Sequence, residues 1–104
     1  MNNKSAYDDH LTALKALAVA YGNEVSPTRA KRLRALINVV RDEVFEMVTQ
    51  DLENSTAAYT ALTPRFQAAA DSLTWVRNQI DKFVLAADQA AKLASWAVSM
   101  LAIL

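Results

Sequence analysis

The chain has 104 residues, the length of one ordinary domain, and its 11 Lys plus Arg balance 11 Asp plus Glu to a formal net charge of zero. It has no cysteine, which excludes a disulfide framework, a thiolate zinc site and a cysteine nucleophile. One glycine and two prolines, against 53% hydrophobic residues, are too few turn residues for a β-sandwich, a β-barrel or a glycine-rich phosphate loop. We therefore expect an all-α fold that forms a single helical domain over residues 1–104.

Turn signals at three places divide this chain into helices. Gly22 suits the left-handed end of a first helix, where a side chain would cost energy. Ser26 before Pro27, and Thr63 before Pro64, each combine a hydroxyl N-cap with a proline at the first helical position. These signals predict helices over about 5–21, 27–61 and 64–104.

The second predicted helix contains one ambiguous segment. Asn54, Ser55 and Thr56 all have side chains that compete with the helical backbone for hydrogen bonds, so the helix either continues through them or breaks there.

The third predicted helix carries the strongest pattern in the sequence. Steps of three and four residues from Phe66 to Leu104 meet only apolar side chains, which is a 3.5-residue repeat over more than five heptads. Such a repeat is typical of a left-handed coiled-coil seam. At 1.5 Å per residue, a continuous helix would be about 60 Å long.

These helices predict a long antiparallel, coiled-coil-like hairpin with the short first helix packed at one end, as a small helical bundle. The first helix is expected to cover the alanine-rich end of the third, which leaves the other end of the hairpin with uncovered apolar side chains. Trp75 and Trp96 are three heptads apart and are expected on one outer face. In the alternative, Trp96 packs beneath the first helix and Trp75 caps the hairpin. Exposed aromatic and aliphatic groups mark interaction sites. The expected partner-binding residues are Phe66, Leu73, Trp75, Val76 and Trp96.

A basic cluster opens the second predicted helix: Arg29, Lys31, Arg32 and Arg34. Cations at a helix N-terminus oppose the macrodipole, so this choice suggests a role beyond folding. The segment has the appearance of a helix-turn-helix with a basic second helix, which makes nucleic-acid binding one interpretation. The zero net charge favours the other, a face that is paired with acids of the chain or binds a partner. The expected intramolecular acids are Asp8, Asp9 and Glu24.

Side chains that could support catalysis are scarce. His10 is the only histidine and is expected to be solvated. The acids Asp42, Glu43 and Glu46 are expected on a solvated helix face, because no Glu-x-x-His motif accompanies them. We expect no enzyme activity, no metal and no cofactor.

The segment Leu93–Leu104 is uncharged over twelve residues, short of the roughly 18 that span a bilayer. A buried core helix is the expectation, with membrane association as the alternative. Residues 1–10 lack the apolar stretch of a signal peptide, which favours a cytoplasmic protein. The function predicted is a non-enzymatic interaction module that self-associates or docks a partner protein. The alternatives are a membrane-active protein and a small nucleic-acid-binding regulator.

Overall fold

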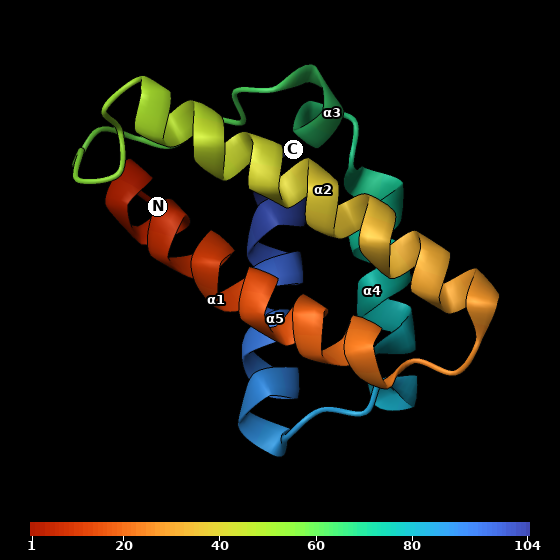
Figure 1. The fold of residues 1–104 in the computed structure, drawn as a ribbon. Coiled ribbons are helices and arrows are strands. Elements are labelled where there is room, and N and C mark those ends of the chain that lie inside the picture. Colours follow the sequence, from red (N-terminus) through yellow and green to blue (C-terminus); the bar gives the residue numbers. More distant parts are fainter.

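Five α-helices and one turn of 3₁₀-helix make up the fold in a computed structural model that describes residues 1–104 (Figure 1). The all-α prediction is confirmed, and the molecule measures 39 × 25 × 21 Å. The elements are α1 (Asn3–Asn23), α2 (Pro27–Thr49), α3 (Pro64–Gln67), α4 (Ala70–Gln79), the 3₁₀ turn η1 (Ile80–Lys82) and α5 (Ala87–Ile103).

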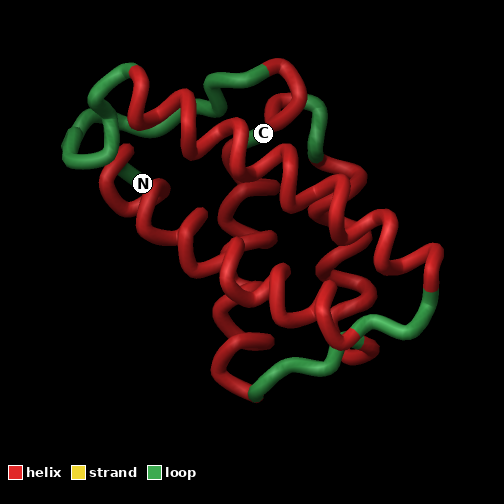
Figure 2. Tube along the Cα trace, viewed as in Figure 1, coloured by secondary structure: helices red, strands yellow, loops and turns green.

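The helices form two antiparallel pairs, α1 with α2 and α4 with α5, stacked so that the axes of one pair cross those of the other (Figure 1). The α1–α2 pair makes one layer, and α5 packs against α1 from the second layer. Figure 2 shows that the loops lie at the edges of this arrangement, the longest of them between α2 and α3. The interior between the layers therefore receives side chains from every long helix.

Both hydroxyl–proline helix starts are confirmed. The Ser26 side chain accepts a hydrogen bond from Arg29 N at 3.3 Å, and Thr63 Oγ1 accepts one from Phe66 N at 3.1 Å. Each satisfies one backbone donor that the first turn leaves free, and the proline that follows has no donor to satisfy. The first helix also lies within two residues of its predicted bounds at either end.

The second helix ends at Thr49, not at residue 61 as predicted, and residues 54–56 lie in the following loop. Its end is a Schellman motif: Leu52 N donates to Met47 O at 2.8 Å, and Asp51 N donates to Val48 O at 3.0 Å. Asp51 adopts the left-handed conformation, with φ of 56°. Asp tolerates that conformation better than most residues, so the helix stops without a glycine.

The loop after α2 is fastened to the start of α1. Asn3 N donates to Ala57 O at 2.8 Å and Lys4 N donates to Ser55 O at 2.9 Å, which satisfies two of the free donors of the first turn of α1. In the other direction, Tyr59 N donates to Met1 O at 3.1 Å. We call these three hydrogen bonds the N-terminal clip.

The prediction of one continuous helix over 64–104, and with it the long coiled-coil hairpin, is wrong. The segment divides into α3, α4, η1 and α5, and the whole molecule is 39 Å long where the rod alone would need about 60 Å. Phe83 and Ala86 have extended backbones, with ψ of 142° and 151°, and the chain reverses between them.

The reversal is held by one contact that is distant in sequence and one that is local. The Asn23 side-chain amide donates to Val84 O at 3.1 Å, and Ala86 N at the start of α5 donates to Gln89 Oε1 at 3.3 Å. By folding back, α5 packs against both α4 and α1, which buries more apolar surface than an isolated rod could. Tertiary packing therefore overrides a helical pattern that has no internal Gly or Pro to stop it.

The apolar repeat holds its phase only up to this reversal. Within residues 66–83, the seam positions Phe66, Ala69, Leu73, Val76 and Phe83 are buried, and Ile80 is half-buried. In α5 the buried face instead consists of Leu93, Trp96, Ala97 and Met100. The loop between η1 and α5 interrupts the helix and changes its phase. The apolar positions before and after this loop therefore do not form one continuous surface.

Candidate functional site

A chain of four polar side chains crosses the core, one from each of four segments of the fold. His10 comes from α1, Glu43 from α2, Tyr59 from the loop after α2, and Trp96 from α5; all four are buried. His10 Nδ1 lies 3.0 Å from Trp96 Nε1, and His10 Nε2 lies 3.0 Å from Tyr59 Oη. Tyr59 Oη lies 2.6 Å from Glu43 Oε2. We call this set the buried polar chain.

The donor and the acceptor of each hydrogen bond in the buried polar chain can be assigned, and they all run in the same direction. An indole N–H only donates, so His10 Nδ1 accepts from Trp96, and a neutral imidazole then carries its proton on Nε2 and donates it to Tyr59. The Tyr59 hydroxyl donates in turn to Glu43.

The carboxylate of Glu43 has two further donors in the backbone after Tyr59. Leu62 N donates to Oε2 at 2.8 Å, and Thr63 N donates to Oε1 at 2.9 Å. A fully buried carboxylate is tolerated only when hydrogen bonds replace its water. Glu43 therefore fixes the end of the 50–63 loop against α2.

Burial determines the protonation states of His10 and Tyr59 in the buried polar chain. Desolvation lowers the pKa of His10 to about 4, so the ring is neutral at neutral pH. The pKa of Tyr59 is raised, first by its burial and then by its hydrogen bond to Glu43 and the charge there. None of the three surface cavities is lined by His10, Glu43 or Tyr59, so these groups face no substrate-sized opening.

The expectations that His10 and Glu43 are solvated are wrong, and the helical phase explains why. In α1 the buried stripe runs through Ala6, His10, Ala13 and Leu17, one position away from the larger apolar residues Leu11 and Leu14. In α2 it runs through Leu36, Val40, Glu43 and Met47. In both stripes the polar residue keeps the three-four spacing of its neighbours, which is the sequence signal that could have revealed it.

The expected partner-binding residues do not form an exposed surface. Phe66, Leu73, Val76 and Trp96 are buried. The rings of Phe66 and Trp96 pack edge-on against His10 of α1, and α4, which carries Leu73 and Val76, packs against α5. Trp75 is half-buried, with the Arg32 guanidinium 4.5 Å above its ring and the Phe83 ring 5.8 Å away. The two tryptophans lie on different helices, so they share no outer face.

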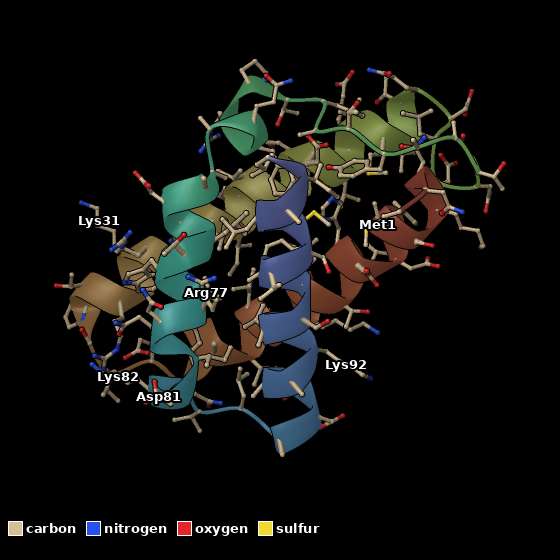
Figure 3. The ribbon with its side chains drawn as sticks, turned by 180° about the vertical axis from the view of Figure 1, so that it is seen from behind. Met1, Lys31, Arg77, Asp81, Lys82 and Lys92 are labelled. Carbon is tan, nitrogen blue, oxygen red and sulfur yellow. The ribbon has the colours of Figure 1, made fainter.

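The basic cluster divides into engaged and unengaged members. Arg29 Nε lies 2.9 Å from Glu24 Oε1, so Glu24 is its predicted intramolecular partner, whereas Asp8 and Asp9 pair with none of the cluster. Arg32 stacks on Trp75. Lys31 and Arg34 are exposed and form no ion pair, and Figure 3 shows Lys31 projecting away from the body of the fold.

The most exposed face of α2 was not anticipated from the sequence. Steps of three and four from Lys31 meet residues that are all exposed, so one whole face of the helix has no intramolecular cover. This face, the outer stripe of α2, consists of Lys31, Arg34, Asn38, Arg41, Phe45 and Val48.

A surface groove of about 760 Å³ runs beside this stripe from Asn38 to Val48. Phe45, with 72% of its surface exposed, stands in it together with Val48 from α2 and Leu14 from α1. Arg65 Nη1 lies 3.2 Å from Asp42 Oδ2 at the same groove. The sequence signal was an aromatic residue out of phase with the buried stripe of its helix. The groove is lined by Leu14, Asn38, Arg41, Asp42, Val44, Phe45, Val48 and Arg65.

The C-terminal helix α5 buries Leu93, Trp96, Ala97 and Met100 in the core.

None of the helices combines the length and the apolar character required to cross a bilayer. Comparison with protein-family models, with curated proteins and with solved structures found no match to this chain.

Proposed function

We propose that this chain is a non-enzymatic helical module that binds another protein through the groove around Phe45. The observation that carries the proposal is the 72% exposure of Phe45 within a cluster of apolar side chains, beside a concave surface. Burying a phenylalanine side chain is worth about 1.5–3 kcal/mol, and the fold leaves this gain unused. Aromatic residues in such positions are typical anchors of protein interfaces.

The contrast with the polar side chains supports a binding role over a catalytic one. The strongest hydrogen-bonded cluster, the buried polar chain, is enclosed in the core and is engaged in joining four segments. The groove offers Arg41, Asp42 and Arg65, of which the last two form an ion pair with each other. Such a set can orient a partner but includes no nucleophile beside a base.

Site-specific photo-crosslinking tests the proposal. A benzophenone amino acid at position 45 is expected to capture one protein in the producing cells, whereas the same group at Val98 of α5, 52% exposed, is expected to capture none. The captured protein, purified, should bind the unmodified chain, and Phe45→Ala should weaken that binding about 10- to 30-fold, or about 1.4–2 kcal/mol. Equal binding by Phe45→Ala and by Val98→Ala would remove the groove as the site.

A further inference from the structure

The outer stripe of α2 has two chemically different halves. Lys31, Arg34 and Arg41 give its first half positive charge, and Phe45 and Val48 make its second half apolar. The stripe contains no acid. From Lys31 to Val48 it extends about 26 Å along the helix, which is the length of about five helical turns.

The cations of this stripe have no counter-ion within the chain. The only two ion pairs of the structure join Arg29 to Glu24 and Arg65 to Asp42, so Lys31, Arg34 and Arg41 are left unpaired. Of the acids close by on α2, Asp42 is held by Arg65, and Glu46 accepts a hydrogen bond from Gln50 at 2.8 Å. A complementary partner must therefore bring negative charge to the first half of the stripe.

A second copy of the chain does not meet this requirement along the same face. A parallel pairing of two outer stripes would place cations against cations. An antiparallel pairing would place Lys31 and Arg34 against Phe45 and Val48 of the other copy, removing water from the cations without supplying an anion. A phosphate polymer would satisfy the cations but leave the apolar half and its groove uncovered.

We propose that the partner segment is an acidic amphipathic helix that lies along α2, with carboxylates over Lys31, Arg34 and Arg41 and large apolar side chains over Phe45 and Val48. This inference rests on the proposed function, because it specifies what occupies the groove. Helix-in-groove recognition supplies the apolar contact, and the unpaired cations fix the register and direction of the bound helix.

The experiment uses the segment that the position-45 crosslink captures, made as a fluorescent synthetic peptide. Its affinity is measured for the wild type, for Phe45→Ala and for the triple variant Lys31→Glu, Arg34→Glu, Arg41→Glu. The matched control is Lys15→Glu, Arg77→Glu, Lys92→Glu, which changes net charge equally at exposed positions outside the stripe. Lys15 and Lys92 line a different cavity, between α1 and α5. Figure 3 shows Lys92 on α5 and Arg77 on α4.

The peptide is expected to carry several carboxylates, to become helical on binding and to lose at least tenfold in affinity to the stripe reversal, with less than a threefold loss to the control reversal. Raising the salt from 50 to 500 mM should weaken wild-type binding by about tenfold and leave the stripe variant nearly unaffected.

Three results would overturn the inference. If Phe45→Ala weakens binding and the stripe reversal does not, the protein-binding function stands and the acidic-helix partner fails. If position 45 captures nothing, or Phe45→Ala has no effect, both proposals fail. If a 20-base-pair DNA duplex or phosphatidylserine vesicles bind the wild type as tightly as the peptide and lose this binding in the stripe variant, the cations serve phosphate instead of a carboxylate helix.

Discussion

The inner and outer faces of α2 place polar and apolar residues in opposite ways. The inner face encloses the carboxylate of Glu43, and two positions later Phe45 stands 72% exposed on the outer face. Glu43 is buried because three donors, from Tyr59, Leu62 and Thr63, replace its water. Phe45 is exposed because no other segment of the chain reaches it. Burial here is decided by helical phase and by available partners, and hydrophobicity alone would assign both residues to the wrong face.

The largest loss of stability is expected from Glu43→Ala, which leaves the buried Tyr59 hydroxyl and the part-buried backbone N–H groups of Leu62 and Thr63 without an acceptor. Unfolding by urea, followed by tryptophan fluorescence, should show a loss of about 3–5 kcal/mol in the free energy of unfolding. Glu43→Gln retains one oxygen but turns an amide N–H toward the donors, so its loss should be smaller. A loss below 1 kcal/mol for Glu43→Ala would show that water enters and replaces the carboxylate.

The second effect concerns pH. His10 has a pKa of about 4 in the fold and about 6.5 when unfolded, so between these values the unfolded chain binds a proton that the folded chain does not. The contribution of neutral, buried His10 to the free energy of unfolding is fully present above pH 6.5. It is lost as the pH falls to 4, by about 3 kcal/mol in all. Urea titrations at pH 7, 6, 5 and 4 measure it.

The matched control for that series is His10→Gln, which has no titrating side chain at this position. Its free energy of unfolding should be lower at pH 7, yet fall less steeply between pH 6.5 and 4 than that of the wild type. Equal slopes for both proteins would mean that other groups cause the acid sensitivity.

A moderate effect is expected from Trp96→Phe. The substitution removes the indole donor and leaves His10 Nδ1 as a buried acceptor without a partner, which costs about 1–3 kcal/mol. Trp75 remains as the fluorescent reporter of unfolding. Trp75→Phe is the comparison, because its ring is half-buried and no hydrogen bond of its indole nitrogen would be lost. If Trp96→Phe and Trp75→Phe lower the free energy of unfolding equally, the hydrogen bond from Trp96 to His10 does not stabilise the fold.

The smallest effect on stability is expected from Phe45→Ala, because the ring has little cover to lose. The free energy of unfolding should stay within about 0.5 kcal/mol of the wild type. Phe66→Ala, which empties a fully buried site, should cost about 3–5 kcal/mol in the same assay. A large loss for Phe45→Ala would mean that the exposed ring stabilises the isolated fold.

The parts of the fold that depend on local chemistry could be predicted from the sequence. The helix class, the approximate bounds of the first helix and the starts at Ser26 and Thr63 follow from composition, caps and proline. The expected left-handed end at Gly22 is wrong, because α1 continues through it to Asn23 and no glycine has a positive φ. The reversal after Phe83 could not be predicted, because no Gly or Pro marks it and its determinants are contacts to α1 and α4. The end of α2 at Thr49 was hidden for a related reason, since Asp51 takes the left-handed position after the helix that glycine usually marks.

The candidate site divides in the same way. Arg29 and its partner Glu24 are five residues apart and could be predicted from sequence. The burial of His10 and Glu43 required the correct helical phase, and their partners Trp96 and Tyr59 lie 86 and 16 residues away. The exposure of Phe45 also required the correct phase of α2, because the residue lies out of phase with the buried stripe of that helix.

The N-terminal clip joins the beginning of the chain to the 50–63 loop, so we expect the two segments to open together. Releasing residues 1–4 removes the partners of Ser55, Ala57 and Tyr59, and a displaced Tyr59 withdraws its hydroxyl from both His10 and Glu43. The amide protons of Asn3, Lys4 and Tyr59 should therefore exchange with solvent deuterium at one shared opening free energy. A fusion partner attached before Met1 that displaced residues 1–4 would therefore disturb the buried Tyr59, some fifty residues along the chain, without contacting it directly.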